Sequence, residues 1–328
     1  MSRTEPRVVV LVAPGAGEPP GLEGVRARAQ VAVVRDFDSL RDVLDGPPRA
    51  DVLAVYDFRT DLIRRLGARA RELAWIHAAS AGVDATLTPD VAAGDTVVTN
   101  AQGVFDRPIA EYVLALLLAF CKDLPTTLDL QRRHRWHHRE SRGFAGRRIL
   151  VVGAGSIGSE VGRLAAAVGA EVRGIASSAR PHPVFGEVHR ATELHEHLGW
   201  ADDVVCCLPL SDATRRLFDA AAFAAMRPGA TFVNVGRGPV VDEVALLDAL
   251  HDGRVAAAGL DVFETEPLPG GHPFWDLDNV VVSPHMSGDE LGWEAALSRQ
   301  LAANLERWRA GEELEHVVHG PTNGRNRT

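Results

Sequence analysis

The chain has 328 residues, of which 46% are hydrophobic and 24% are charged, and its formal net charge at pH 7 is −9. This length is enough for two domains with separate cores, and the composition excludes a disordered or fibrous protein. The acidic balance argues against nucleic acid as a partner, because phosphate binding needs a basic face.

The three cysteines lie within apolar runs, and two of them, Cys206 and Cys207, are adjacent, which disfavours an unstrained disulfide between them. We therefore expect reduced, buried thiols in a cytoplasmic protein. The apolar runs 8–13 and 114–120 are too short to span a bilayer, and no signal-peptide cleavage site follows the first. No membrane partner is expected.

The first hundred residues alternate between short apolar runs and polar segments that are compatible with helices, such as 38–44 and 61–66. Strands are predicted over 7–13, 30–34, 51–56, 73–78 and 95–100. Strands that alternate with helices at this spacing are typical of a parallel sheet covered on both faces. We therefore expect one α/β unit here.

The segment 109–120 is almost continuously apolar and rich in helix formers, which predicts a buried helix at a domain or subunit interface. The next segment, 124–146, is rich in arginine and histidine and is interpreted as a solvated or interface loop. Its His134, His137 and His138 lack the cysteines or carboxylates that would complete a coordination shell. No metal site is expected.

A second series of strands and helices begins with a predicted strand at 148–153. Further strands are predicted near 171–175, 203–207, 231–235, 256–260 and 279–283. Helices are predicted over 159–168 and about 289–309. The polar tail 321–328 is expected to be disordered.

The first strand of this series runs into the glycine cluster G-A-G-S-I-G, and a predicted helix follows. In this context Gly153 permits a tight turn, Gly155 lets the backbone approach a pyrophosphate, and Gly158 allows helix and strand to pack closely. Ser156 and Ile157 lie in the same cluster, just before the predicted helix, whose free N-terminal N–H groups bind phosphate. The cluster predicts a dinucleotide site; the alternative is a glycine-rich turn that serves packing alone.

The second strand of a dinucleotide-binding unit commonly ends in an acidic residue that binds the ribose hydroxyls of NAD. This chain has A-S-S-A-R at 176–180 instead, without a carboxylate. The hydroxyls of Ser177 and Ser178 and the guanidinium of Arg180 are suited to the 2′-phosphate of NADP. The sequence therefore favours NADP(H) over NAD(H), while Arg180 can also be read as an ordinary surface arginine.

Three polar side chains, Arg237, Glu266 and His285, each follow a predicted strand of this series. The carboxyl ends of parallel strands form the ligand-binding edge of an open α/β sheet. An arginine, an acid and a histidine together can bind a 2-keto acid, polarise its carbonyl and donate a proton. Each residue alone is explained as well by a structural role, so the prediction depends on their joint occurrence.

The motifs at these positions closely resemble those of the D-isomer-specific 2-hydroxyacid dehydrogenase family. They are the S-A-G-V-D loop at 80–84, the glycine cluster, N-V-G-R-G-P-V-V-D at 234–242, D-V-F-E-T-E-P-L at 261–268 and S-P-H at 283–285. The resemblance covers nearly the whole chain and points to a glyoxylate/hydroxypyruvate reductase-like branch. It implies two doubly wound parallel-sheet α/β domains, with a Rossmann cofactor domain inserted in a flavodoxin-like substrate domain.

The implied boundaries assign 1–101 and 287–328 to the substrate domain and 102–286 to the cofactor domain. Members of this family are commonly dimeric through the cofactor domain, which would suit the apolar helix predicted at 109–120. A homodimer is therefore expected.

The resemblance also implies a role for each matched residue. His285 would donate a proton to the substrate carbonyl oxygen, Glu266 would hold the histidine ring, and Arg237 would bind the substrate carboxylate. The implied substrate contacts are Ser80, Ala81, Gly82 and Arg237. The implied cofactor contacts beyond the glycine cluster are Leu208, Pro209 and Thr214 on the adenosine side, together with Val235, and Asp261 at the nicotinamide carboxamide.

These residues predict an NAD(P)-dependent oxidoreductase that reduces a small 2-keto acid to the D-2-hydroxy acid by hydride transfer, with histidine as the general acid. The alternative comes from another class of protein: a dinucleotide-sensing binding protein, like the corepressor branch of the same family, with little or no turnover. The intact arginine, acid and histidine weigh against the sensor, because a sensor does not need a proton donor.

Overall fold

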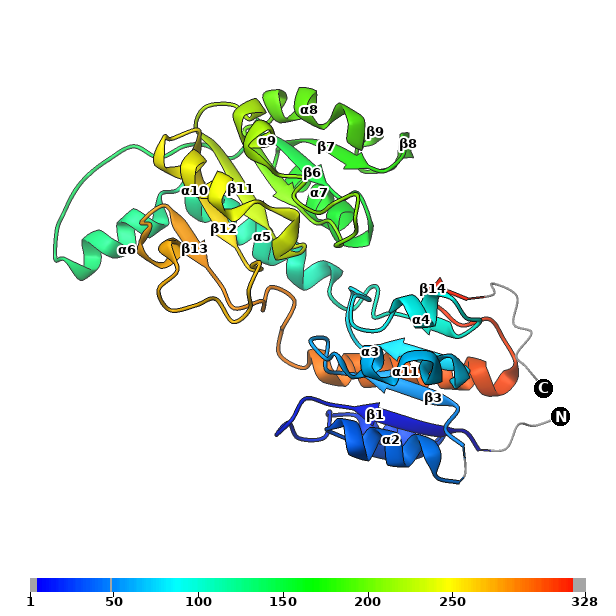
Figure 1. Ribbon diagram of the computed structural model, residues 1–328. Helices are drawn as coiled ribbons and strands as arrows, with labels where there is room; N and C mark the ends of the chain where they lie inside the picture. The colour runs from blue at the N-terminus through cyan, green and yellow to red at the C-terminus, as the bar shows by residue number, and fades with distance from the viewer. Residues whose placement is uncertain (1–4, 48, 321–328) are drawn as a thin grey trace. The chain divides into compact units, whose positions relative to one another are not determined.

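The computed structural model describes residues 5–47 and 49–320, and the tail predicted to be disordered lies outside these ranges. The chain divides into two compact units: one holds the residues up to Phe105 and those from Leu291 on, and the other is Asp106–Glu290. In each unit, helices cover both faces of a sheet (Figure 1). The predicted α/β fold class is confirmed.

The first unit is built on a six-stranded sheet with the order β14-β5-β4-β3-β1-β2. Its strands are β1 (Arg7–Leu11), β2 (Gln30–Val34), β3 (Val52–Val55), β4 (Trp75–Ala78), β5 (Val97–Thr99) and β14 (Val317–His319). All pairings are parallel except that of β14 with β5. Its helices are α1 (Leu22–Arg26), α2 (Phe37–Asp45), α3 (Leu62–Leu66), η1 (Gly67–Glu72), α4 (Pro89–Ala92) and α11 (Trp293–Ala310).

The core of this unit has two layers, because successive side chains along a strand point to opposite faces of the sheet. Val9 of β1 is buried on the face that Leu40 of α2 covers. Its neighbour Val8 is buried on the other face, in a cluster with Leu301 and Trp308 of α11. Helix α11, from the C-terminal part of the chain, therefore packs on the sheet that contains β1, the first strand.

The second unit is built on an eight-stranded sheet with the order β13-β12-β11-β10-β6-β7-β9-β8. Its strands are β6 (Arg148–Val152), β7 (Glu171–Ala176), β8 (Arg180–His182), β9 (Gly186–Arg190), β10 (Asp203–Cys206), β11 (Ala230–Asn234), β12 (Val255–Leu260) and β13 (Val280–Val282). Only the β8–β9 pairing is antiparallel among these strands. Its helices are α5 (Asp106–Cys121), α6 (Leu124–Arg132), α7 (Ser156–Ala167), α8 (Leu194–Trp200), α9 (Ala220–Ala225) and α10 (Glu243–His251), with short 3₁₀ helices η2 (Ala191–Glu193), η3 (Gly238–Val240) and η4 (Pro273–Asp276).

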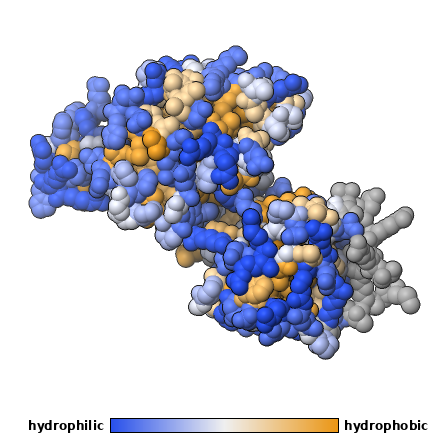
Figure 2. All heavy atoms as spheres, in the orientation of Figure 1, coloured by the Kyte–Doolittle hydropathy of each residue, from blue (hydrophilic) through white to orange (hydrophobic). Residues whose placement is uncertain are grey.

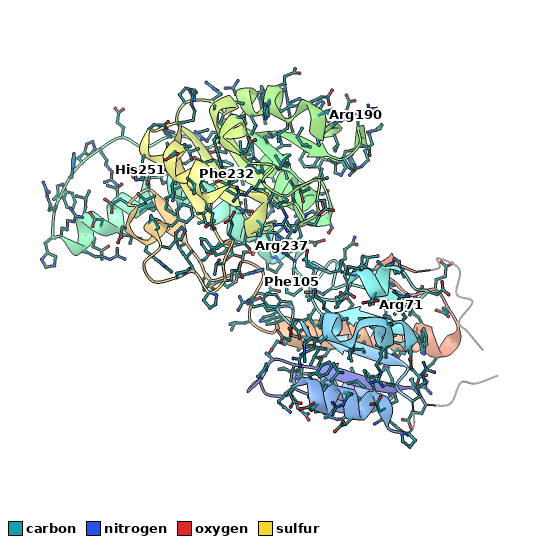
Figure 3. All side chains as sticks on the ribbon, in the orientation of Figure 1. Arg71, Phe105, Arg190, Phe232, Arg237 and His251 are labelled. Carbon is teal, nitrogen blue, oxygen red and sulfur yellow. The ribbon has the colours of Figure 1, made fainter. Side chains whose placement is uncertain are left out.

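Aromatic side chains fill the centre of this second core. Phe232 of β11, labelled in Figure 3, lies 4.9 Å from Phe218 and 5.4 Å from Phe223, measured between ring centroids. All three side chains are buried. Because β11 is a central strand, this packing fixes the strand whose carboxyl end leads to Arg237.

Two expectations about the elements are wrong. The segment 124–146 is not a loop throughout, because its first part forms α6, and most of the basic residues that suggested a loop come after this helix. Proline at the start of α6 is compatible with a helix, since the first N–H groups have no intrahelical partner. The last helix begins at Trp293 rather than near 289, because Gly292 has a left-handed conformation with φ of 90°.

Three short strands were not predicted: β8, β9 and β14. The segment of β8 contains Pro181, which reads as a strand breaker, but proline is tolerated in an edge strand, and β8 is the edge of its sheet. Strands β8 and β14 each form the edge of one sheet through an antiparallel pairing, whereas all other pairings in the two sheets are parallel.

The cysteines are free thiols, with Cys121 and Cys206 buried and Cys207 partly buried. Burial raises the pKa of Cys206 to about 12, so this thiol is unreactive at neutral pH. Within the described ranges, none of the helices combines the length and the apolarity needed to span a lipid bilayer.

Candidate active site

The glycine cluster forms a tight turn between β6 and α7. Gly153 has φ of 107°, a conformation that favours glycine, and a Cβ there would lie 2.7 Å from the carbonyl group of Cys207. A Cβ on Gly158 would lie 2.0 Å from the carbonyl oxygen of Gly153. At Gly155 a Cβ would have no neighbour within 4 Å, so this position is open on one side. The turn is therefore tightly packed at Gly153 and Gly158 but open to a ligand at Gly155, as a dinucleotide-binding loop requires.

The start of α7 provides the donors for a phosphate. Ser156 and Ile157 occupy its first turn, where backbone N–H groups have no partner within the helix. Gly155 precedes them, and no side chain caps the helix. The residues present therefore fit a pyrophosphate at this end of α7.

The ends of β10 and β11 lie beside the glycine turn. Leu208 packs its backbone on Gly236, where a Cβ would lie 2.6 Å from the carbonyl oxygen of Leu208. Thr214 is partly buried, and its hydroxyl donates to the carbonyl oxygen of Pro209 at 2.7 Å, which closes the loop after β10. Val235 is buried just after β11. These four predicted cofactor residues therefore lie at neighbouring strand ends of the same sheet.

Arg180 reaches back to the glycine turn from β8. One guanidinium nitrogen donates to the carbonyl oxygen of Ala154 at 2.9 Å, and the other donates to that of Ser178 at 3.4 Å. Ser177 and Ser178 follow β7 and are exposed. The three residues predicted to bind a 2′-phosphate thus lie together beside the start of α7.

Glu266 and His285 are in direct contact. Nδ1 of His285 lies 2.8 Å from Oε2 of Glu266, and the other carboxylate oxygen accepts a hydrogen bond from the backbone N–H of Phe263 at 3.1 Å. Because an ionised carboxylate can only accept hydrogen bonds, Nδ1 carries a proton and donates a hydrogen bond to Glu266. Nε2 of His285 is then the ring nitrogen that does not contact Glu266. Both side chains are about one-fifth to one-quarter exposed, at 19% and 24%.

Asp261 fixes the turn that carries His285. Its carboxylate accepts from the hydroxyl of Ser283 at 2.6 Å and from the backbone N–H groups of Met286 and Ser287 at 3.0 and 2.9 Å. It is 1% exposed and lies just after β12. The sequence suggested a contact with the nicotinamide carboxamide for this residue, but missed that it holds the residues on both sides of the histidine.

Arg237 follows β11 and the buried Asn234, and Figure 3 labels its position. Asn234 donates to the carbonyl oxygen of Arg237 at 3.3 Å and accepts from the backbone N–H of Gly236 at 3.1 Å. A Cβ on Gly238 would lie only 1.9 Å from the backbone of Phe263. The backbone after Arg237 therefore packs directly on the segment that leads to Glu266, so the three predicted catalytic residues belong to adjoining loops of one unit.

The predicted substrate contacts Ser80, Ala81 and Gly82 belong to the other compact unit. They follow β4, and each of their carbonyl oxygens accepts a hydrogen bond. That of Ser80 accepts from the N–H of Ala101 at 3.0 Å, and that of Ala81 from the side chain of Asn100 at 2.7 Å. The carbonyl oxygen of Gly82 accepts from the hydroxyl of Ser80 at 2.7 Å. The loop is therefore held in a defined conformation.

One cluster of titratable side chains in the second unit was not predicted from the sequence. Ligand atoms of His189, Glu193 and His197 lie within 4.8 Å of one another. However, the two imidazole rings are stacked, with centroids 4.1 Å apart, and a guanidinium nitrogen of Arg173 lies 3.3 Å from Nδ1 of His197. Stacked rings do not aim their nitrogens at one point, and a neighbouring cation disfavours a metal ion, so this cluster is better explained as packing on α8.

Comparisons with known proteins show which family this chain resembles. The family model described as "D-isomer specific 2-hydroxyacid dehydrogenase, NAD binding domain" matches residues 114–287, which is more than half of the chain. A D-isomer specific 2-hydroxyacid dehydrogenase from Xanthobacter autotrophicus Py2, solved with NADPH and MES, aligns with a TM-score of 0.82 and 32% identity, covering 96% of this chain and 98% of that one.

Two further relatives differ in the activity that their names give. An NADPH-dependent glyoxylate/hydroxypyruvate reductase from Sinorhizobium meliloti, solved with NADP and sulfate, has a TM-score of 0.82 and 28% identity, covering 96% of this chain and 98% of that one. A D-3-phosphoglycerate dehydrogenase from Mycobacterium tuberculosis strain H37Rv is 34% identical over 303 residues, but this chain matches 89% of its own length to only 57% of that protein.

The glycine turn beside α7, the paired acid and histidine, and the full-length structural matches lead to one assignment: this chain belongs to the D-isomer specific 2-hydroxyacid dehydrogenase family and carries that family's NAD binding domain.

Proposed function

We propose that the protein is an NAD(P)-dependent reductase that converts a small 2-keto acid into the D-2-hydroxy acid. The observation that carries this proposal is the 2.8 Å contact between His285 and Glu266, on a turn that Asp261 holds before the histidine through Ser283 and after it through Met286 and Ser287. A partly buried carboxylate behind a histidine fixes the orientation of the ring, as a general acid requires.

The residues divide the chemistry among them. Nε2 of His285 donates a proton to the C2 oxygen of the keto acid, while Nδ1 remains bound to Glu266. Arg237 pairs with the substrate carboxylate, because a guanidinium matches its two oxygens. The backbone of 80–82 is proposed to bind the same carboxylate. When bound, the reduced nicotinamide supplies the hydride to C2.

The proposed cofactor is NADP(H) rather than NAD(H). The support is the group formed by Ser177, Ser178 and Arg180 beside the start of α7, with no acidic residue at 176–180. Two of the solved relatives are complexes with NADPH or NADP. NAD(H) remains the alternative, since the matching family model is named for NAD.

The proposed substrate is a small 2-keto acid such as glyoxylate or hydroxypyruvate. The support is the Sinorhizobium meliloti reductase, which aligns over nearly its full length, whereas the phosphoglycerate dehydrogenase aligns over little more than half of its own.

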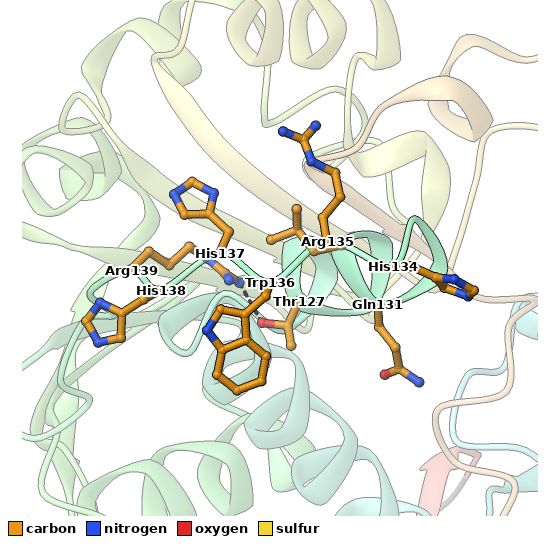
Figure 4. A pocket seen from close by; sticks show the side chains of 9 residues that line it. Thr127, Gln131, His134, Arg135, Trp136, His137, His138 and Arg139 are labelled. Atoms are coloured by element: carbon orange, nitrogen blue, oxygen red, sulfur yellow. Dashed lines mark hydrogen bonds between the residues drawn. The ribbon is translucent and has the colours of Figure 1, made fainter.

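A homodimer through the second unit is also proposed. Apolar side chains of α5, α6 and β13 line a groove, in which Leu124 and Leu128 are 46% and 50% exposed. Beyond α6, Trp136 is fully exposed on an extended segment, and Figure 4 shows it beside His137, His138 and Arg139. Figure 2 shows hydrophobic residues interrupting the hydrophilic surface of this unit. Exposed apolar surface of this kind is typical of an interaction site.

The test is the oxidation of NADPH and of NADH, followed at 340 nm, with a panel of small 2-keto acids. We expect turnover with at least one acid and a higher kcat/KM with NADPH. Cofactor binding without turnover across the panel would contradict the reductase and favour the dinucleotide sensor.

A further inference from the structure

The loop 261–272, between β12 and η4, carries Glu266 and is also bonded to the start of α10. The backbone N–H of Phe263 donates to one carboxylate oxygen of Glu266 at 3.1 Å. The next N–H along the chain, that of Glu264, donates to the carboxylate of Glu243 at 2.8 Å. Two consecutive backbone N–H groups therefore end on two different carboxylates, one of which contacts His285.

Glu243 is the first residue of α10, and only 14% of its side chain is exposed. A carboxylate suits this place, because the first turn of a helix carries a partial positive charge. The helix itself is capped by another residue, since the carboxylate of Asp242 accepts from the N–H groups of Val244 and Ala245 at 3.1 and 3.2 Å. Asp242 thus caps the helix, while Glu243 bonds to the loop.

The segment 237–243 meets the peptide bond between Phe263 and Glu264 at two points. Near one end, a Cβ on Gly238 would lie 1.9 Å from the carbonyl group of Phe263 and 2.5 Å from the nitrogen of Glu264. At the other end, Glu243 accepts from that same nitrogen. The first contact is steric, whereas the second is a directed hydrogen bond to a charged group, the stronger kind. Glu243 therefore fixes the orientation of a peptide group two residues before Glu266.

Two further contacts join the loop to neighbouring side chains, and both are longer. The other carboxylate oxygen of Glu243 lies 3.3 Å from Nε2 of His272. A guanidinium nitrogen of Arg216 lies 3.6 Å from the carboxylate of Glu264, but this arginine is 60% exposed, and exposed ion pairs contribute little. The bond between Glu243 and the N–H of Glu264 is the shortest of these three contacts.

We propose that Glu243 is a positioning residue for the reduction of the keto acid: its bond to the N–H of Glu264 holds the loop in the conformation from which Glu266 reaches His285. This inference rests on the proposed function, because it concerns the general acid of that reaction. Glu243 acts through Glu266 and is given no contact with the reacting atoms. No role is assigned to His272, whose contact with Glu243 is the longer one.

The test compares the kcat of the wild type with that of three variants of Glu243, using a keto acid and a dinucleotide that give turnover. Glu243→Ala removes the acceptor and is expected to lower kcat by about tenfold, the value of one charge-assisted hydrogen bond. Glu243→Asp keeps the charge but withdraws the carboxylate by one methylene, so a similar fall is expected. Glu243→Gln keeps the length and an acceptor oxygen, and its kcat should stay within about threefold of the wild type. The Kd of the dinucleotide, measured by calorimetric titration, should change less than about twofold in all three.

A double-mutant cycle with Glu266→Ala separates positioning from simple stability. Because Glu243 acts through Glu266, adding Glu243→Ala to Glu266→Ala is expected to lower kcat less than about twofold further. An equal fall in both backgrounds overturns the inference, since a merely structural residue would act in either.

Asp248→Ala and His272→Ala are the matched controls. The first removes an exposed acid from the same helix, and the second removes only the longer contact of Glu243, so both should keep kcat close to that of the wild type. Melting temperatures identify any variant that fails to fold; if Glu243→Ala fails, the comparison of Glu243→Asp with Glu243→Gln decides. Equal kcat in those two variants, or an unchanged kcat in Glu243→Ala, overturns the inference. A wild type without turnover on any keto acid contradicts the proposed function itself.

Discussion

His285 occupies a left-handed backbone conformation, with φ of 56°, that few residues other than glycine adopt. Such a conformation costs about 1–3 kcal/mol and persists only where the surroundings determine it. Here the carboxylate of Asp261 binds the backbone on the C-terminal side of the histidine, and Glu266 binds the ring. The position and the direction of the imidazole are therefore fixed before any substrate arrives.

The first prediction follows from this geometry. His285→Ala is expected to lower kcat by about 10²–10⁴-fold, the range typical for the loss of a general acid. Cofactor affinity should change little, because His285 is bound to Glu266 and not to the glycine turn. Steady-state kinetics and calorimetric titration measure the two quantities.

The chain supplies a matched control for this variant. His272 also pairs with a glutamate, Glu243, at 3.3 Å, but it precedes η4 and has no proposed role in the reaction. His272→Ala should keep kcat close to that of the wild type. Full activity in His285→Ala would refute the assignment of the general acid.

At the scale of the elements, the parallel sheet of the second unit gathers the ends of β11, β12 and β13 along one edge. Residues far apart in the sequence meet there through backbone contacts that only glycine permits. Gly238 is the clearest case, because its Cα faces the backbone of Phe263 without room for another atom. The spacing of Arg237 from Glu266 thus depends on one glycine that touches no ligand.

The second prediction concerns this contact. In Gly238→Ala the new Cβ would lie 1.9 Å from the carbonyl group of Phe263, so one of the two loops must shift. We expect a loss of stability of about 1–3 kcal/mol, typical of overpacking, together with a large fall in kcat. Gly253→Ala adds the same methyl group at an exposed glycine with an open surrounding and φ of 75°. It should lower the melting temperature through backbone strain but leave kcat unchanged. An unaltered kcat in Gly238→Ala would contradict the proposed role of the contact.

The elements that carry the site could largely be predicted from the sequence, because their signals are local. Apolar strands followed by glycine or by a polar side chain identified β6 and its turn as well as the ends of β11 to β13. Three features could not be predicted in this way. Pro181 concealed the hairpin of β8 and β9, and the packing of the Phe185 ring against α7 and β7 is possible only because Gly162 and Gly174 lack side chains. The bonds of Asp261 to the turn around His285 arise only when two strands lie side by side.

At the scale of the molecule, each unit has its own core, and the first one contains a buried histidine. His77 of β4 is fully buried, its Nδ1 lies 2.9 Å from the hydroxyl of Thr99, and the indole of Trp75 donates to the same hydroxyl at 2.8 Å. Burial, and to a lesser degree the nearby His316, lowers the pKa of His77 to about 3. The folded protein therefore holds this side chain in its neutral form.

The third prediction is the pH dependence that follows. An unfolded histidine takes up a proton as the pH falls below about 6.5, whereas folded His77 does so only near pH 3. The contribution of His77 to the free energy of unfolding is therefore fully present above pH 6.5. It falls as the pH is lowered, by at most about 1.4 kcal/mol per pH unit. Thermal unfolding of the wild type and of His77→Gln between pH 4.5 and 7.5 measures this slope. The variant should show a shallower acid loss, and equal slopes would contradict the assignment.

The last prediction concerns the assembly of two chains. The groove lined by α5, α6 and β13 holds Leu128, which is half exposed and would be covered in the proposed homodimer. We expect size-exclusion chromatography with light scattering to give twice the 35.3 kDa of one chain. Leu128→Glu should shift this mass toward one chain, because burying an unpaired carboxylate in an apolar interface is costly. Leu291→Glu is the matched control, since Leu291 is fully exposed and belongs to the other unit, and it should leave the mass unchanged. A wild type with the mass of one chain would refute the dimer, and an unchanged mass in Leu128→Glu would place the interface elsewhere.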